Sequence, residues 1–217
     1  MNRLLFILSC LFVCSASLQC KNSKTTEVQS PAYSFDTEYD GNKATLLSIS
    51  GDAYNLMELR GYLGTNNAII KENKETEVVE YQMKLIENLI NTSVKSKNIK
   101  NNQSRFKDSY KGWTSKKNSS TLNTEVPLYE SYSFFYIAQF LYYVKSSEWY
   151  KNVPNNQARW NATLSFLEHN IWTKWYERCL LVKDNNYWYF LRSRIHMGSH
   201  WAGIAMYLNV LTHNEKI

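Results

Sequence analysis

The order of four stretches with helical spacing of apolar residues constrains the fold most. Residues 77–95 and 157–181 each carry one apolar and one charged face, whereas residues 130–145 and 199–211 are apolar or aromatic on all sides. A helix with one apolar face lies on the outside of a domain, and one that is apolar all round is buried among other helices. The order outer, inner, outer, inner predicts an all-α fold of α-hairpins stacked side by side.

Composition agrees with a helical domain of ordinary size. The 217 residues can bury a real hydrophobic core, and only 7 Gly and 3 Pro argue against a many-stranded β protein. The formal net charge of +6 is modest, and no basic run resembles a nucleic-acid footprint, so no nucleic-acid partner is predicted. A further short helix is expected over 53–63.

The first twenty residues resemble a bacterial lipoprotein signal. Arg3 gives a positive start, and residues 4–13 are apolar but too few to span a bilayer stably. The resemblance implies that Cys20 carries lipid and begins an exported, periplasmic or cell-surface lipoprotein anchored in the outer membrane. The alternative is ordinary secretion, with cleavage near Ala16 or Gln19.

The rest of the chain is interpreted as a polar tether over 21–44 and a single helical domain over 45–217. Within the domain, residues 96–129 show no sustained period, and so long a connection is either functional or disordered. Large aromatic side chains favour an ordered loop over 105–113, whereas 115–124 is expected to be floppy.

Topology is expected to bring distant residues to one rim of the domain. Consecutive helices joined by short links are antiparallel, so the two buried helices run parallel and begin on the same side. The long connection leads into the first of them. The residues expected on this rim are Arg105, Trp113, Glu130, Tyr132, Arg194, His196, His200 and Trp201.

Three reactive side chains, Arg194, His196 and His200, lie within seven residues of one another. Ser199 is predicted to cap the last helix, which places His196 in a loop and His200 in the first turn. A helix start carries partial positive charge and unpaired N–H groups, so it suits an anionic ligand. The alternative is that both histidines only pack or cap.

A row of polar-tipped side chains, Tyr132, Tyr136, Gln139 and Tyr143, follows one face of the first buried helix. Their hydroxyl groups need hydrogen-bond partners, so the row faces either a wet cavity or the core with its tips in water.

The stretch 127–132 opening one buried helix and 194–201 opening the next resemble the helical-toroid polysaccharide lyases of bacteria, most nearly those acting on alginate or glucuronan. The resemblance covers about residues 75–212. It implies an α/α toroid that cleaves an acidic, uronate-containing polysaccharide by β-elimination without a cofactor. Such enzymes close a ring of more hairpins than this chain supplies, so an incomplete, open toroid is expected, either a shortened or a truncated relative.

A uronate lyase must remove the weakly acidic C5 proton while neutralising the adjacent carboxylate. Arg194 is the candidate for pairing with the carboxylate. His196 or His200 is the candidate base, and Tyr132 the candidate acid for the leaving oxygen. The residues expected to contact the sugars are Arg105, Trp113, Glu130, Tyr136 and Trp201.

Other functions compete with the lyase. A metal site would need a third ligand beside His196 and His200, and only Glu130 offers one, so no metal is predicted. A glycosidase would need a pair of carboxylates across the cleft, and again only Glu130 is evident. The main alternative is a surface lipoprotein that binds glycan without catalysis, or an inactive truncated relative.

Overall fold

A computed structural model describes residues 53–74, 76–104, 106–115, 122–178, 181–184, 187–190 and 195–214. The expectations for the leader, for lipid on Cys20 and for the tether over 21–44 concern residues outside these ranges. Among the helices in the described ranges, none combines the length and apolar character needed to cross a membrane.

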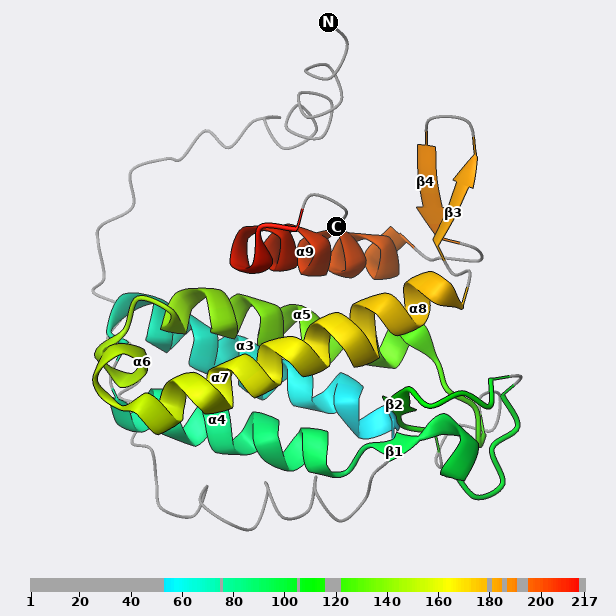
Figure 1. Cartoon of the computed structure of the whole chain (residues 1–217), viewed down its shortest axis with the longest axis horizontal. Helices are drawn as coiled ribbons and strands as arrows, with labels where there is room; N and C mark the ends of the chain where they lie inside the picture. Colours follow the sequence, from blue (N-terminus) through cyan, green and yellow to red (C-terminus); the bar gives the residue numbers. More distant parts are fainter. Residues whose placement is uncertain are drawn as a thin grey trace, which may run out of the picture. The chain divides into compact units, whose positions relative to one another are not determined.

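The described residues are mostly helical, which confirms the all-α fold class (Figure 1). Two small antiparallel hairpins accompany the helices, the first pairing Val94 with Gly112 and the second pairing Leu181 with Phe190. The helices are α3 (Ala53–Glu72), α4 (Thr76–Asn91), α5 (Pro127–Val144), α6 (Glu148–Asn152), α7 (Pro154–Phe166), α8 (Lys174–Glu177) and α9 (Ile195–Thr212). The strands are β1 (Val94–Lys95), β2 (Lys111–Gly112), β3 (Leu181–Asp184) and β4 (Tyr187–Phe190).

The helix predicted over 157–181 consists of α7, a π-helix over Leu167–Thr173 and α8, and it ends at Glu177. A π-helix closes its hydrogen bonds one residue further along than an α-helix and is rare outside functional regions. Lys174 and Trp175, which follow it directly, are both buried. The π-helix therefore leads straight into the part of the helix that carries buried polar groups.

Helix α3 is longer than the predicted 53–63 and continues through both of its glycines. An added Cβ on Gly64 would lie 3.1 Å from the Tyr136 ring, so the glycine allows close packing on α5. Leu63 and Ile70 are fully buried on either side of it. Burial of this apolar face outweighs the low helix propensity of glycine, about 1 kcal/mol per residue.

Helix α9 departs from the expectation at its start and on its outer face. It begins at Ile195 rather than at Ser199, so Met197 and Gly198 are helical and not a loop. It is also not buried all round, because Met206 is 70% exposed and Val210 51% exposed. The buried side is formed by Met197, Trp201, Ile204, Leu208 and Leu211.

Helices α5 and α9 pack side by side and run in the same direction. Near their starts, the ring of Tyr132 lies 4.8 Å from that of His200. Further along both helices, Gln139 Nε2 donates a hydrogen bond to Tyr207 Oη at 3.2 Å. Contacts that advance together along two helices require them to be parallel. The expectation that these two helices run parallel is therefore confirmed.

Helix α3 lies on the other side of α5 and is parallel to it as well. Ser133 Oγ donates to the Leu56 carbonyl, and further along both helices Asn67 Nδ2 donates to Gln139 Oε1 at 3.0 Å. Helices α3, α5 and α9 thus form one layer with α5 in the middle (Figure 1).

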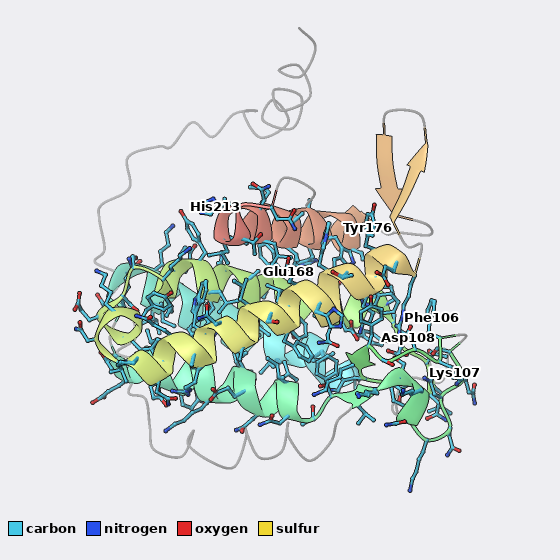
Figure 2. All side chains as sticks on the ribbon, in the orientation of Figure 1. Phe106, Lys107, Asp108, Glu168, Tyr176 and His213 are labelled. Atoms are coloured by element: carbon cyan, nitrogen blue, oxygen red, sulfur yellow. The ribbon has the colours of Figure 1, made fainter. Side chains whose placement is uncertain are left out.

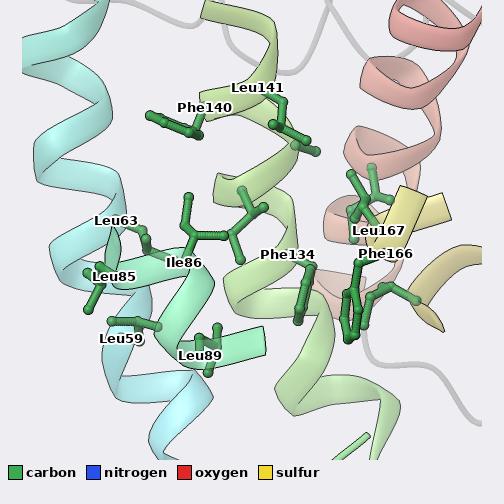
Figure 3. Packing of buried hydrophobic residues seen from close by; sticks show 14 of the residues in the cluster. Leu59, Leu63, Leu85, Ile86, Leu89, Phe134, Phe140, Leu141, Phe166 and Leu167 are labelled. Carbon is green, nitrogen blue, oxygen red and sulfur yellow. The ribbon is translucent and has the colours of Figure 1, made fainter. Parts of the chain in front are cut away.

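Helices α4 and α7 form a second layer. Helix α7 is antiparallel to α5, because Trp160 Nε1 donates to the Leu141 carbonyl while Lys174, beyond the other end of α7, pairs with Glu130. Side chains from both layers meet in one apolar core (Figure 3). Core side chains include Leu59, Leu63, Leu85, Ile86, Leu89, Phe134, Phe140, Leu141, Phe166 and Leu167.

A chain of amide side chains crosses this core. Asn66 Nδ2 donates to Gln82 Oε1 at 2.7 Å, and Gln82 Nε2 donates to Asn67 Oδ1 at 3.1 Å. Asn67 in turn donates to Gln139 on α5. Because a buried amide without a partner is costly, this network fixes the register of α3 against α4 and α5.

The contact between α5 and α9 predicts opposite effects for two glycines of α9. An added Cβ on Gly203 would lie 2.6 Å from Phe135 Cδ2, whereas one on Gly198 would meet nothing within 4 Å. Gly203→Ala should lower the free energy of unfolding by about 1–3 kcal/mol through overpacking. Gly198→Ala should raise it by up to about 1 kcal/mol through helix propensity. Urea unfolding measures both, and equal effects would contradict the close α5–α9 contact.

The link between the outer helices predicts a pH-dependent stability. Arg159 contacts Glu80 and Glu87 on α4, each at 2.7 Å. Burial alone would raise the pKa of Glu80, but its hydrogen bonds from Arg159 and Trp149 and the Arg159 charge outweigh burial and hold the pKa below 4.5. A carboxyl group with a lowered folded pKa stabilises above its unfolded pKa and loses that contribution as the pH falls through the folded value.

Arg159→Gln should therefore cost about 1–2 kcal/mol near neutral pH. The difference from the wild type should shrink as the pH falls below 4.5. Lys84→Gln is the matched control, because the exposed Lys84 contacts the same carboxylate at 3.7 Å and should change stability by less than about 0.5 kcal/mol. A difference independent of pH would show that the Arg159–Glu80 pair does not carry the effect.

Candidate functional site

Three helices of the inner layer bring one tyrosine, one histidine and one arginine together. The Tyr132 ring of α5 meets the His200 ring of α9 edge-on at 4.8 Å between centroids. Arg60 Cζ of α3 lies 4.5 Å from the centroid of the same tyrosine ring. Tyr132 and His200 are half-buried and Arg60 is exposed. The group thus combines a hydroxyl group, an imidazole and a permanent cation.

The packing beneath this group holds the imidazole in place. The Phe135 ring lies 5.4 Å from the His200 ring and is accommodated by Gly203, as described above. Tyr136 follows on α5 and packs on Gly64 of α3. Its neighbour Phe135 meets it edge-on at 5.1 Å. Aromatic rings therefore extend from His200 across α5 towards α3.

The polar-tipped row on α5 continues beyond Tyr136. Gln139 donates to Tyr207 of α9, and burial raises the pKa of Tyr143, with a hydrogen bond to Tyr207 adding to the rise. Tyr136, Gln139 and Tyr143 are half-buried, so the row is neither sealed in the core nor fully open. The sequence left two interpretations open, a row that faces a wet cavity and a row packed in the core with its tips in water. The partial burial of these side chains fits the second, with the row packed along one edge and its polar tips at the surface.

Glu130 does not reach this group. Its side chain is fully buried, with Oε2 2.7 Å from Lys174 Nζ and 2.6 Å from Trp175 Nε1. Burial raises the pKa of Glu130, a rise that the Lys174 charge opposes, and burial likewise lowers the pKa of Lys174. Glu130 was expected to contact sugars, and the structure corrects this: the carboxylate is enclosed because its partner is an equally buried ammonium group.

A second set of buried charges adjoins the first. Arg178 Nη2 contacts Asp108 Oδ1 at 2.8 Å, and Arg178 Nη1 contacts Glu125 Oε1 at 3.2 Å. The guanidinium also lies 4.3 Å from the Phe106 ring centroid. Figure 2 shows Phe106 and Asp108 together on the connection between α4 and α5, near the end of α8. One arginine thus anchors both the middle and the end of this connection.

The sequence does not identify these buried cations, because Lys174 and Arg178 lie within 157–181, a stretch predicted to carry a charged outer face. The available signal was their position beside Trp175, a residue expected on the inner face. Arg60 was also missed, because the helix predicted around it appeared short and ended at glycines. Gly112 marks the enclosure, since an added Cβ would lie 2.6 Å from Glu125 Oε1 and 2.9 Å from Lys174 Nζ.

The ordered loop expected over 105–113 is confirmed for the described residues 106–113, where Lys111 and Gly112 form β2. Residues 116–121 of the supposedly floppy stretch lie outside the described ranges, whereas Asn123 is held by a backbone hydrogen bond to Ser115 at 2.7 Å.

Two tryptophans expected to stack on sugars are core residues instead. Trp113 is 2% exposed, packs on Phe134 and Phe166, and donates its Nε1–H to Thr92 Oγ1 at 2.7 Å. Trp201 is 1% exposed and lies 6.3 Å from the Trp172 ring. Both indoles are almost wholly covered by other residues, and the large apolar area of tryptophan explains why both pack inside.

Some sequence candidates cannot be placed. Arg105 and Arg194 lie outside the described residues, and for His196 only the backbone is described, in the first turn of α9. His196 and His200 are thus one helical turn apart, the spacing that the metal alternative required. Within the ranges that the structure describes, no group of three or more His, Cys, Asp or Glu side chains is arranged to hold a metal ion.

No protein-family model, curated protein or solved structure matches this chain. Its function is therefore inferred from its residues and their geometry.

The buried Glu130–Lys174 pair predicts a large loss of stability when one partner is removed. Lys174→Met leaves a buried carboxylate without its cation, and we expect the free energy of unfolding to fall by about 3–5 kcal/mol. Lys151→Met is the matched control, since its pair with Glu148 is exposed and should contribute less than about 1 kcal/mol. Replacing both buried partners, as in Glu130→Leu with Lys174→Met, should recover part of the loss. A loss from Lys174→Met no greater than in the control would refute the pair's role.

Proposed function

We propose that this protein is an exported polysaccharide lyase that cleaves a uronate-containing polysaccharide by β-elimination. The observation that carries the proposal is the contact of Tyr132, His200 and Arg60, contributed by three different helices of one layer. These side-chain types supply the proton donor, the base and the cation that elimination next to a carboxylate requires. Export, and a lipid anchor on Cys20, are proposed from the N-terminal sequence alone.

The arrangement of the helices supports an open α/α toroid as the finer description of the fold. In a stack of α-hairpins, the inner helices run parallel to one another and antiparallel to the outer ones. The parallel layer of α3, α5 and α9, with α7 antiparallel to α5, follows this rule. The proposed site lies on the inner layer, where a polymer would lie in a toroid's groove.

In the proposed reaction, His200 takes the C5 proton of a uronate residue. The electron pair left behind forms the C4–C5 double bond, the C4–O bond breaks, and the leaving oxygen takes a proton from the Tyr132 hydroxyl. Arg60 pairs with the uronate carboxylate and stabilises the charge that develops on it. Arg194 and His196 remain sequence-based candidates for the same two tasks of carboxylate pairing and base.

The alternative is glycan binding without catalysis. It is favoured by the half-buried row of Tyr136, Gln139 and Tyr143, because aromatic rings with polar tips suit sugar faces and hydroxyl groups alike. Binding needs no base, so a variant that lacks the base should lose cleavage but keep binding.

The activity test measures the ultraviolet absorbance of the unsaturated product during incubation with alginate, glucuronan or a neutral glucan. Absorbance should rise only with the acidic polymers and should persist with a chelator present. Tyr132→Phe and His200→Gln should each lower kcat/KM about 100-fold or more. Arg60→Gln should mainly weaken the binding of the acidic substrates, because it removes the cation that pairs with their carboxylates.

The matched controls are Tyr142→Phe, an exposed tyrosine of the same helix, and His213→Asn, an exposed histidine just after α9. Asparagine suits the left-handed backbone of residue 213, where φ is 54°. Both controls should retain full activity. Saturable polymer binding without any absorbance change would favour the binding alternative, and activity unchanged in all three site variants would remove these residues from the reaction.

A further inference from the structure

We propose a second saccharide-binding site, in the connection between α4 and α5, that holds a single uronate unit with its carboxylate against Lys100. The connection borders an open cavity of about 360 Å³ beside the β1–β2 hairpin. Cavities of a few hundred cubic ångströms are typical of small-ligand sites. Of the described residues that line it, Gly112, Trp113 and Thr114 are buried, and Val94, Asn98 and Lys100 are exposed.

The lining has the chemistry of a site for a polyhydroxylated anion. Two amides, Asn98 and Asn123, and the Thr114 hydroxyl group line it and provide both donors and acceptors. The Thr92 hydroxyl group also lines it but already donates to the Leu89 carbonyl, so it offers a ligand an acceptor only. Lys100 is the one charged side chain among the described residues that line the cavity. With no carboxylate among them, nothing in the described lining repels a ligand of single negative charge. A uronate has hydroxyl groups for the polar side chains and a carboxylate for Lys100. A neutral sugar has the hydroxyl groups but lacks the charge.

The walls of the cavity are held before any ligand binds. Val94 pairs with Gly112 across the hairpin, and Lys97 N donates to the Asp108 carbonyl at 3.0 Å. On the far wall, the backbone of Asn123 bonds to Ser115, as described above. Arg178 fastens both walls through its ion pairs with Asp108 and Glu125. Because these bonds exist already, binding costs little ordering of the chain.

The cavity is separate from the group around Tyr132. Trp113 packs on Phe134, which is fully buried, whereas Tyr132 and Phe135 contact His200 of α9. The body of α5 thus lies between the two sites. A uronate bound beside Lys100 serves to retain the polymer and does not require the proposed cleavage chemistry.

Titration calorimetry with D-glucuronic acid and with D-glucose tests the proposal. Glucuronic acid should bind saturably and more tightly than glucose. Added salt should weaken the binding of glucuronic acid and leave that of glucose unchanged. Lys100→Gln should lower the affinity for glucuronic acid about fivefold and leave the affinity for glucose unchanged. Lys97→Gln is the matched control, because Lys97 is a nearby exposed lysine that does not line the cavity.

Asn123→Gly tests the neutral part of the site. The φ angle of Asn123 is 56°, which glycine adopts freely, so the variant removes the amide without straining the loop. Binding of both sugars should weaken, and Tyr132→Phe should leave it unchanged even if that variant abolishes cleavage. The proposal is overturned if neither sugar binds, if binding survives both cavity variants, or if Tyr132→Phe removes it.

Discussion

The Glu130 carboxylate is taken wholly out of water, and the arrangement around the proposed site depends on how it is satisfied. It receives the ammonium group of Lys174 and the indole N–H of Trp175, two neighbours on the outer helix. These bonds tie the first turns of α5 to the end of the second layer. Because Tyr132 follows two residues later on α5, the same bonds position the start of the helix from which it projects.

The inner layer depends on a different constraint, the absence of side chains at two glycines. Gly64 admits Tyr136 and Gly203 admits Phe135, so α3 and α9 both approach α5 closely. Close approach brings side chains of three helices within reach of one another near the layer's surface. The layer therefore combines tight backbone packing below with a polar, aromatic group above.

Much of the helical architecture can be predicted from sequence because the spacing of apolar residues is local information. It predicts α4, α5 and the parallel course of α5 and α9, and hence the meeting of Tyr132 with His200. It does not predict which cation meets Glu130, because Lys174 is remote in the chain and its direction depends on the rotation of its helix. It also misplaces Trp113, whose indole is as suited to a core as to a sugar face.

The π-helix over Leu167–Thr173 sets the rotation of everything that follows it. A π-helical turn closes its hydrogen bonds between residues i and i+5, so it holds one residue more than an α-helical turn. The segment therefore accommodates an extra residue while Trp160 before it and Lys174 after it both face α5. Removing one residue here leaves a turn that an ordinary α-helix can close, so the fold tolerates a deletion at this point better than the same deletion within α7.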